Sequence, residues 1–451
     1  MYGMPQFTPI LLISLLGLML NAQSALGNDR LVLEYWDKWT GIEADAMREI
    51  VEDYNSSQSE VEVRYLSVSQ IERKLMLAIA GGNPPDLAGI YSHVLSIYAE
   101  NNALIPLDGL LRNSEIREEN YLPVYWKACR HRGFTWGLPT TPSTVALYWN
   151  KAIFREAGLD PEKPPTSLAE LEAINDALLV KDADGRILRL GHTPQEPGWW
   201  NPLWVYWFGG RLDESPDTPV VDTPATRATF TWLQSYPKRF GGQALQALRN
   251  GFGNFASPQN SFFTGRVAMT LQGPWLFNFI NQYAPPDFEW GVAPFPSADP
   301  EALPNVTIAE CDVLVIPKGT RHVREAFRFI EYVNSQPVLE KLCIGQRKFS
   351  PLREVSSDFY SRHPNPRIKV FVDLAASPNA LLAPRQILWP EIKSALSVAF
   401  DQELLKGEDP ALLLEPIETR LDRIRERQEA RWQRLSGSRM KEWKQLVNST
   451  P

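Results

Sequence analysis

Aromatic and charged side chains lie next to each other at the end of the first stretch of the chain that predicts a strand. That stretch, Leu31 to Trp36, leads into Asp37, Lys38 and Trp39. In open α/β sheets, ligands bind beyond the carboxyl ends of the strands. Aromatic rings pack on the apolar C–H faces of a sugar ring, and fixed planar polar groups bond to its hydroxyl rim. Trp36, Asp37, Lys38 and Trp39 therefore predict noncovalent recognition of a polyol ring, although Trp36 fits a core position equally well.

Two other features supply candidates for the same chemistry. The chain contains 15 Trp residues and is 11% aromatic, and residues 199–208 hold four Trp, one Tyr and one Phe. Aromatic side chains also build cores, so their number alone decides little. Asp86 follows Pro84-Pro85, where its carboxylate either forms part of a turn or accepts a hydrogen bond from a ligand hydroxyl group.

Signatures of covalent catalysis are absent from the sequence. It contains no G-x-S-x-G, no H-E-x-x-H and no G-x-x-x-x-G-K motif, and its five His residues are scattered without i, i+4 pairing. We therefore predict a protein that is not an enzyme, with no catalytic residue, no metal site and no cofactor. A glycosidase needs two facing carboxylates, and the 53 acidic residues keep a secreted carbohydrate-active hydrolase as the second hypothesis.

Short apolar strands alternate with helical patterns around these candidates. Strands are predicted over Leu31 to Trp36 and Val61 to Leu66, with a helix over Glu43 to Tyr54 between them. This β-α-β start predicts a parallel sheet covered by helices. Thr166 or Ser167, with Glu170 at capping-box spacing, predicts the start of a later helix. The other predicted helices are Ile71 to Ala80, Lys151 to Ala157, Ser167 to Leu179 and Val323 to Asn334, and the other strands are Val145 to Trp149, Val267 to Leu271 and Asp312 to Pro317.

Length, charge and the first residues bound the class of protein. A chain of 451 residues exceeds what one hydrophobic core usually organises, so two lobes are expected. A net charge of −7 argues against nucleic-acid binding, which needs a basic face. The apolar run Ile10 to Leu20 and the small-x-small sequence Ala25-Leu26-Gly27 predict a signal peptide over residues 1–27. No Cys follows this leader directly, so we expect a periplasmic protein without a lipid anchor.

The cysteine content leaves the disulfide state open. The chain has three Cys residues, Cys129, Cys311 and Cys343, and no C-x-x-C pair. In an oxidising compartment this odd number allows one disulfide and one free thiol. The sequence does not choose the pairing.

Three segments occur in an order that is typical of one known family. They are Ala78 to Leu87 (AIAGGNPPDL), Ala146 to Glu170 (ALYWNKAIFREAGLDPEKPPTSLAE) and Phe262 to Trp275 (FFTGRVAMTLQGPW). With them, the chain from about Leu31 to about Leu421 resembles the family 1 extracellular solute-binding proteins, the sugar-capturing components of ABC importers. The resemblance implies a type II periplasmic binding protein fold of the α/β class. Each of two lobes would hold a mainly parallel sheet flanked by helices, and crossover hinge segments would lie near Pro139, Phe295 and Pro351.

The same resemblance implies the extent of each domain. The N-terminal lobe would comprise residues 28–140 and 296–350, and the C-terminal lobe residues 141–295 and 351–416. Residues 417–451 depart from the family pattern and predict a charged helical extension. Its basic residues outnumber its acids, and Leu421, Ile424, Trp432 and Leu435 leave only a thin apolar stripe. We expect a solvated helix that packs weakly on one lobe, with contact to anionic lipid or to a partner as the alternative.

The resemblance further implies which residues bind ligand. Trp275, after Gly273-Pro274, matches a sugar-stacking tryptophan of the family, with lobe packing as its alternative role. Trp199 or Trp200 occupies the place of a second stacking aromatic, with one of the two expected to be buried, and Trp389 matches a third.

Polar ligand-binding residues are implied in the same way. Asp37 and Lys38 match an acid and a lysine of maltose-binding relatives, and Tyr91 and His93 lie where relatives have pocket residues. Arg353 either reaches the cleft near the third crossing or forms an exposed salt bridge. Where relatives often carry Gly-Gly, this chain has Ala309-Glu310-Cys311, so Glu310 is a candidate for selecting a hydroxyl pattern.

The implied function follows from this family. The expected protein is a periplasmic monomer that captures a carbohydrate, a di- or oligosaccharide, and delivers it to the transmembrane subunits of an ABC permease. Two alternatives also describe a binding protein. In one the ligand is a glycerol phosphodiester instead of a carbohydrate, and in the other the partner is a sensory receptor. No nucleic acid and no cofactor are expected.

Overall fold

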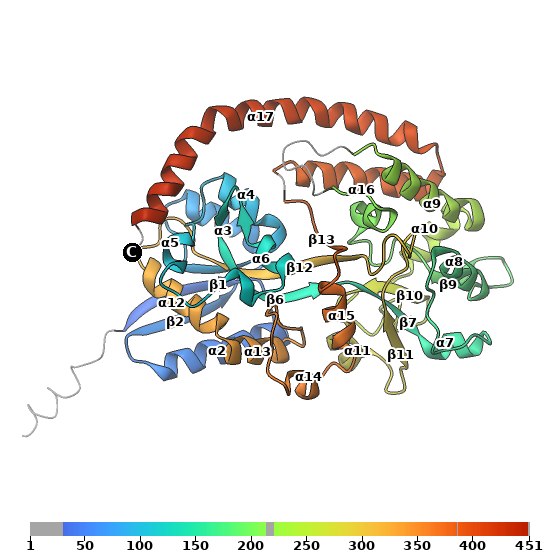
Figure 1. The fold of residues 1–451 in the computed structure, drawn as a ribbon. Helices are drawn as coiled ribbons and strands as arrows, with labels where there is room; N and C mark the ends of the chain where they lie inside the picture. Colours follow the sequence, from blue (N-terminus) through green and yellow to red (C-terminus); the bar gives the residue numbers. More distant parts are fainter. Residues whose placement is uncertain (1–29, 213–220, 386, 450–451) are drawn as a thin grey trace, which may run out of the picture.

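The computed structural model describes residues 30–212, 221–385 and 387–449. The signal peptide predicted over residues 1–27 lies outside the described residues. The described chain folds around two main sheets, one of six strands and one of five. Figure 1 shows each sheet at the centre of one lobe, with helices packed around it.

The first lobe is built on the six-stranded sheet. β1 (Leu31–Asp37) pairs in parallel with β2 (Val61–Ser67) and with β3 (Leu87–Tyr91). β12 (Thr307–Val315) runs antiparallel to β3, and β6 (Gly137–Thr144) and β13 (Ala380–Leu382) both pair with β12. Its helices are α2 (Gly41–Ser57), α3 (Ile71–Ala80), α4 (Leu95–Glu100), α5 (Asp108–Leu111), α6 (Pro123–Ala128), α12 (Val323–Asn334) and α13 (Gln336–Gly345). Because β1 and β3 are parallel neighbours, the residues that follow them lie at one edge of the sheet.

The second lobe is built on the five-stranded sheet, in the order β11-β7-β10-β9-β8. Its strands are β7 (Ala146–Asn150), β8 (Val180–Lys181), β9 (Ile187–His192), β10 (Val267–Gln272) and β11 (Trp290–Ala293). Its helices are α7 (Lys151–Glu156), α8 (Leu168–Ala177), α9 (Pro224–Phe240), α10 (Gly242–Asn250), α11 (Leu276–Tyr283) and α16 (Trp389–Lys406). Shorter elements are the 3-10 helices η1 (Ser92–Val94), η2 (Glu118–Asn120) and η3 (Asn201–Phe208), the hairpin β4 (Arg130–His131) with β5 (Phe134–Thr135), and the helices α14 (Phe359–Arg362) and α15 (Ile368–Ala375).

The prediction of a mainly parallel sheet is wrong for the second lobe. Only β9 and β10 pair in parallel among its described strands, whereas β7 pairs antiparallel with both β10 and β11, and β8 pairs antiparallel with β9. A short turn around Asp184-Gly185 joins β8 to β9, and a connection of this length permits only a hairpin.

The chain passes between the two sheets at two points near the sheet centres. β6 continues into β7 through the single residue Val145, and the chain returns to the first sheet between β11 and β12. β13 pairs with Thr307 to Ala309, the first residues of β12 and therefore the part nearest this return. β6 and β12, which lie side by side, thus form the base shared by the two lobes.

Local sequence signals located many of the other elements. α3 and α12 have the predicted bounds, because clear apolar periodicity and flanking Gly or Pro residues define both. Ser167 is the cap of α8: its hydroxyl accepts from the Glu170 N–H at 3.2 Å, and Glu170 accepts in return from the Thr166 N–H at 2.7 Å. β12 begins five residues before the predicted Asp312, at Thr307, so Glu310 belongs to the strand.

The aromatic residues 199–208 are mostly core. Trp204 and Trp207, in η3, are 1% and 0% exposed and pack with Phe295 at centroid distances of 5.1 and 5.7 Å. Trp199, by contrast, is 43% exposed. The segment therefore divides into a buried helix and an accessible aromatic turn that precedes it.

All three cysteines are buried free thiols. The disulfide that their number allowed is therefore not present. Burial raises the pKa of the Cys311 thiol well above its ordinary value, and the neighbouring Cys129 thiol raises it further.

The carboxyl-terminal helix α17 (Pro410–Ser449) packs differently from the prediction. Figure 1 shows it arching from the second lobe to the first. Leu414 near one end and Trp443 near the other are both completely buried. The expectation of weak packing on one lobe is wrong, because these two side chains join two different hydrophobic cores. No helix in the described part of the chain combines the length and apolarity needed to cross a bilayer.

Candidate ligand-binding site

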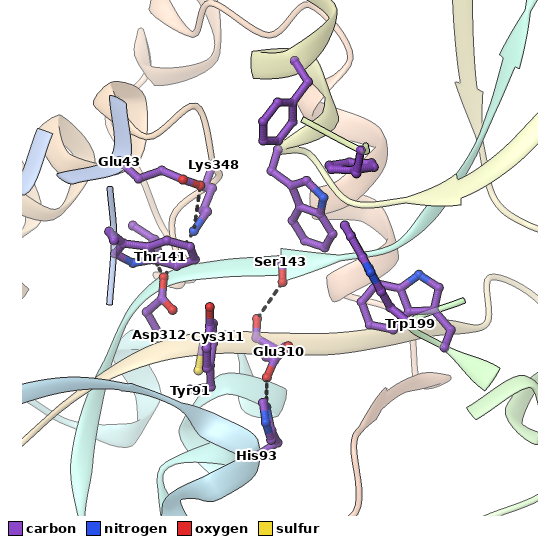
Figure 2. Close-up of a pocket in the computed structure, with 15 residues that line it drawn as sticks. Glu43, Tyr91, His93, Thr141, Ser143, Trp199, Glu310, Cys311, Asp312 and Lys348 are labelled. Atoms are coloured by element: carbon purple, nitrogen blue, oxygen red, sulfur yellow. Dashed lines mark hydrogen bonds and ion pairs between the residues drawn. The ribbon is translucent and has the colours of Figure 1, made fainter. Parts of the chain in front are cut away.

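A cavity of about 350 Å³ lies between the two lobes, with β6 and β12 at its base (Figure 2). Both lobes contribute aromatic side chains to it, and its charged groups come from the first lobe and from the base. The lining residues are Trp39, Glu43, Tyr91, His93, Thr141, Ser143, Trp199, Trp200, Phe255, Trp275, Phe279, Glu310, Cys311, Asp312 and Lys348.

The wall of the first lobe consists of Trp39 and Tyr91. Trp39 follows β1 and Tyr91 ends β3, so the parallel pairing of these strands brings the two residues together. Their rings meet edge to face, with centroids 5.8 Å apart, and Tyr91 stacks on the His93 imidazole at 5.5 Å. This wall is an aromatic surface with a titratable group at its end.

The wall of the second lobe is entirely aromatic. Trp275, at the start of α11, lies 6.4 Å from Trp199 and 6.3 Å from Trp200 between ring centroids. The Trp275 indole N–H donates to Gln272 Oε1 at 3.1 Å, and that of Trp200 donates to the Leu271 carbonyl at 3.2 Å. Because both polar groups are satisfied within the protein, the rings offer apolar faces to a ligand.

Glycine is required beneath the Trp275 ring. A Cβ atom at Gly273 would lie 2.1 Å from the indole Cζ3 of Trp275. The Gly-Pro-Trp sequence therefore lets the ring fold back over its own backbone, in addition to ending β10.

A β-bulge forms the base of the cavity. β6 carries one more residue than β12 between the pairs Cys311–Pro142 and Val313–Pro139, so both Thr140 and Thr141 lie opposite Asp312. The Thr141 hydroxyl donates to Asp312 Oδ2 at 2.6 Å. Bulges re-aim side chains next to functional sites, and here the bulge directs a threonine hydroxyl onto a buried carboxylate.

Two lysines hold the same carboxylate. Lys38 Nζ lies 2.9 Å from Asp312 Oδ1, and Lys348 Nζ lies 3.2 Å from Oδ2. Burial would raise the pKa of Asp312, but Lys348 and Lys38 outweigh burial and lower it. Asp312 is therefore an anion whose two oxygens are already engaged by the protein, and it positions its neighbours.

Lys348 connects this anion to the aromatic wall. Its Nζ lies 4.0 Å from the Trp39 ring centroid and 3.7 Å from Glu43 Oε1. An ammonium over an indole face is attracted by the ring quadrupole. Lys348 thus fixes the plane of Trp39 against the charged base.

Glu310 and His93 form the second charged pair of the cavity. Glu310 Oε1 contacts His93 Nδ1, and the other imidazole nitrogen lies 3.9 Å from Glu72 Oε1. Burial would lower the pKa of His93, but Glu310 outweighs it and the pKa is raised. Of the two carboxylate oxygens of Glu310, only Oε1 has a hydrogen-bond partner within the described residues, so Oε2 is available as an acceptor.

Seven of the predicted ligand-binding residues line this one cavity. They come from five separate segments of the chain: Trp39, Tyr91, His93, Trp199, Trp200, Trp275 and Glu310. Whether they bind ligand remains a prediction, but the fold brings them within one volume.

Asp37 and Lys38 lie behind the wall instead of lining it. Asp37 is 2% exposed and accepts from the Lys38 N–H at 2.7 Å, and the Tyr35 hydroxyl donates to it at 2.5 Å. The Lys38 ammonium lies 4.6 Å from the ring centroids of both Trp39 and Tyr91. Because these residues face the interior, they support the aromatic wall from beneath.

The four other candidates lie outside the cavity lining. Trp36 packs against a core cluster, and Trp389, at the start of α16, is 4% exposed in the core of the second lobe. Asp86 accepts hydrogen bonds from the Glu34 N–H and the Thr320 hydroxyl, so its carboxylate joins segments that are distant in the sequence and does not form a local turn. Arg353 lines a separate cavity beside Glu354, in which the acidic residues outnumber the basic ones.

Sequence reasoning missed the other lining residues, and some had usable signals. Phe279 lies one helical turn after Trp275, and Asp312 lies two residues after Glu310 on the same strand face. Glu43 and Lys348 carried no local signal, because only tertiary packing brings α2 and the segment after α13 to the cavity.

The charges of the lining decide what it can hold. Glu43, Glu310 and Asp312 face a single Lys among the described lining residues, and that Lys is paired. The described residues contain no group of three or more His, Cys, Asp or Glu side chains suited to a metal ion. The arrangement can clamp a neutral ring between aromatic faces and accept its hydroxyl protons.

Comparison with known proteins points in the same direction. The model of the family described as bacterial extracellular solute-binding protein matches residues 40–338. A maltotriose-binding protein of Pyrococcus abyssi is 22% identical over 74% of this chain and 69% of its own length. An sn-glycerol-3-phosphate-binding periplasmic protein of Pectobacterium atrosepticum is 23% identical over 61% of this chain and 63% of its own.

A solved structure matches most of the fold. It is the protein CpMnBP1 with mannobiose bound, which is 25% identical to this chain and superimposes with a TM-score of 0.76. The match covers 87% of this chain and 99% of that one. The two-lobe architecture is therefore shared along nearly the whole of that protein.

Proposed function

Because this chain belongs to the bacterial extracellular solute-binding proteins, we propose that it captures a carbohydrate between its lobes and delivers it to the transmembrane subunits of an ABC permease. A di- or oligosaccharide is the ligand class that the cavity favours. The protein acts by binding and release, as a periplasmic monomer without a cofactor or nucleic acid. Residues 1–27 would direct the chain to the periplasm and would then be cleaved off, and the mature protein would carry no lipid anchor.

One observation carries this proposal: two aromatic walls from different lobes face each other across a polar base. A cavity of about 350 Å³ lies in the range of roughly 300–1,000 Å³ that is typical of small-molecule sites. The rings of Trp39 and Trp275 suit the C–H faces of sugar rings, and Glu310 Oε2 suits their hydroxyl groups.

The alternative ligand is a glycerol phosphodiester. The sn-glycerol-3-phosphate-binding relative supports it, whereas the carboxylates of the cavity lining disfavour an anion. Phosphate sites in proteins use Arg forks or free helix N-termini. The described lining has no Arg, and its Lys348 already pairs with Asp312. A phosphate placed here would lie beside carboxylates, which costs binding free energy.

The hydrolase alternative requires a pair of free carboxylates beside the ligand. Asp312 gives both oxygens to Lys38, Lys348 and Thr141. A nucleophile or general base needs an accessible lone pair, so Asp312 is poorly placed for either role. Purified protein incubated with oligosaccharides should release no reducing ends, and turnover near the typical enzyme rate of about 10 per second would favour the hydrolase.

Binding and closure are coupled by differential affinity. A sugar that contacts Trp39 on one lobe and Trp275 on the other stabilises the arrangement in which both contacts exist. Hinge strands β6 and β12 connect the lobes beneath the ligand. The closed form is then the species that a permease or, in the alternative, a sensory receptor recognises.

The test is a thermal-shift screen of the mature protein against mannobiose, maltotriose, a glucose monomer, glycerophosphocholine as the phosphodiester, and sn-glycerol-3-phosphate as its phosphate. A ligand at 100 times its Kd stabilises the folded state by about 2.7 kcal/mol, so a true ligand gives a clear shift. We expect a di- or trisaccharide to give the largest shift. A shift with the phosphodiester or its phosphate alone would replace the carbohydrate proposal. N-terminal sequencing of the periplasmic fraction tests the predicted cleavage.

A further inference from the structure

Helix α17 is attached to the second lobe by its first three turns. Leu413, Leu414 and Leu421 are at most 8% exposed and share a core with α9 and α16. Glu418 accepts from the backbone N–H groups of Val221 and Asp222 at 2.7 and 3.0 Å. Apolar burial and charge-assisted hydrogen bonds together fix this end.

The last turns of α17 are attached to the first lobe. Trp443 is 0% exposed, and its ring meets that of Trp136 edge to face at 4.9 Å. Its indole N–H donates to Asn102 Oδ1 at 3.0 Å. Glu442 accepts from the Asn102 amide and pairs with Lys318. A buried tryptophan with a satisfied N–H and a charged rim is a specific contact, unlike the loose packing of a solvated helix.

The middle of the helix is more exposed than its two ends, and its apolar side chains are only partly buried. Arg427, Arg431 and Arg434 are exposed, and Trp432 is partly covered by the Arg132 guanidinium, 4.2 Å from its ring centroid. The helix runs without interruption for 40 residues, which corresponds to about 60 Å at 1.5 Å per residue. The buried side chains of this long helix lie toward its two ends, and Figure 1 shows the helix arching from one lobe to the other.

A weak point lies just before the second attachment. Ser436-Gly437-Ser438 interrupts a sequence of good helix formers, and Gly and Ser pairs are common sites of helix bending. A Cβ atom added at Gly437 would meet nothing within 4 Å. No contact therefore requires a glycine at this position, and its effect is on the stiffness of the helix.

We propose that α17 is a strap that couples the two lobes, so that its attachment through Trp443 sets the interlobe arrangement and thereby the affinity of the ligand cavity. The lobes are joined through β6 and β12, through the segment between β13 and α16, and, independently, through α17. A rotation of one lobe on these strands must bend α17 or strain the contacts of Trp443 and Glu442. Since those contacts differ in energy between arrangements, they bias the equilibrium without touching ligand.

The experiment measures the distance between the lobes directly. Spin labels are placed on Glu52→Cys in α2 and Ala183→Cys in the β8–β9 turn, both exposed positions. The native thiols are at most 2% exposed, so labelling is selective. Double electron–electron resonance on the full chain then compares Trp443→Ala, Glu442→Ala, Gly437→Ala and Lys444→Ala, an exposed neighbour that serves as the matched control.

We expect Trp443→Ala to shift or broaden the distribution of interlobe distances. Glu442→Ala should have a smaller effect of the same kind, and Gly437→Ala should narrow the distribution. Lys444→Ala should match the parent chain. Sugar affinity should change by about fivefold or more in Trp443→Ala, although Trp443 is remote from the cavity. If Trp443→Ala is folded and its distance distribution matches that of the parent chain, the strap proposal is wrong. If Trp443→Ala unfolds, a distance distribution of Glu442→Ala that matches the parent chain overturns the proposal instead.

Affinity depends on the proposed function, whereas the distance measurement does not. If no sugar binds but the distances shift, the strap stands and the carbohydrate proposal fails. If sugar binds and the interlobe distances of the variants match those of the parent chain, the carbohydrate proposal stands and the strap proposal fails.

Discussion

At the scale of single residues, Trp275 is the sharpest test of the cavity. Trp275→Ala removes the central ring of the second wall while its backbone remains at the start of α11. Losing an aromatic contact costs about 0.5–1.5 kcal/mol beyond the area term of roughly 25 cal/mol per Å², so sugar affinity should fall at least about tenfold. Calorimetric titration with the best sugar of the screen measures this.

The matched control for Trp275 is another tryptophan from the set predicted to bind ligand. Trp36 packs against the core and does not line the cavity. Trp36→Ala should lower the melting temperature and leave affinity within about twofold. Equal losses of affinity in both variants would show that neither ring has a direct role.

Asp312 should dominate the acid sensitivity of the site. Its pKa lies below the ordinary value of 3.8 because Lys348 and Lys38 outweigh burial. A depressed carboxyl pKa contributes stability that is present above the unfolded pKa and is lost as pH falls through the folded pKa. Asp312→Asn should therefore lower the unfolding free energy at pH 7 by about 3–5 kcal/mol, because it leaves buried lysines unpaired, and should flatten the loss of stability below pH about 4.

Urea unfolding from pH 3 to pH 7 measures that difference. The exposed pair Lys369–Asp373 supplies the control, since Asp373→Asn removes a carboxylate from a surface ion pair at 2.9 Å. Such pairs contribute roughly 0–1 kcal/mol. A steep acid limb that persists in Asp312→Asn would place the acid sensitivity elsewhere.

The sequence predicted the aromatic half of the cavity better than its charged half. Trp39 follows the predicted first strand, Tyr91 was implied by the family resemblance, and Trp275 belongs to a short motif with strong backbone requirements. The side chains of Asp37 and Lys38 lie behind the wall, and a residue type and a position after a strand do not predict on which side of a wall a side chain lies. Lys348 was unpredictable, since only the packing of α13 brings it to Trp39 and Asp312.

At the scale of secondary structure, the β1–β3 pair explains why Asp37 is held in the interior. A Cβ atom at Gly89 on β3 would lie 2.6 Å from Asp37 Oδ1. Gly89→Ala should therefore displace the Asp37 carboxylate and cost about 1–3 kcal/mol by overpacking. The aromatic wall above Asp37 should move with it, so affinity should fall as well.

Chemical denaturation and calorimetry separate the two effects of Gly89→Ala. Gly437→Ala adds the same methyl group to open space in α17 and should leave the unfolding free energy unchanged or raise it by up to about 1 kcal/mol. If the Gly89→Ala variant is as stable as the parent chain, the backbone of β3 can shift at this position to accommodate the added methyl group.

Prediction of the elements was most accurate where one local rule sufficed. α3, α8 and α12 have periodic apolar faces with caps or breakers, and these act over a few residues. The antiparallel pairing of β7 depends on its direct continuation from β6 across the two sheets, which no local pattern encodes. The packing of α17 depends on Trp443, whose burial could not be inferred from a thin apolar stripe.

At the scale of the whole molecule, the two lobes meet at β6 and β12 and at the α17 strap, and the cavity belongs to neither lobe alone. Each lobe supplies one aromatic wall, and the charged groups come from the first lobe and the shared base. A ligand held between the two walls must therefore contact both lobes. Ligand binding should then stabilise the molecule as one unit.

Hydrogen exchange can test this coupling between lobes. With saturating sugar, amides in the first turns of α2, near Glu43, and of α11, near Trp275, should both slow. These helices belong to different lobes, so a ligand that only rests on one aromatic wall would protect one and leave the other unchanged. Trp275→Ala should abolish protection in α11 first and weaken it in α2, because the contact that spans the cavity is lost. Protection confined to one lobe in the parent chain would contradict closure around the ligand and would reduce the site to a surface groove.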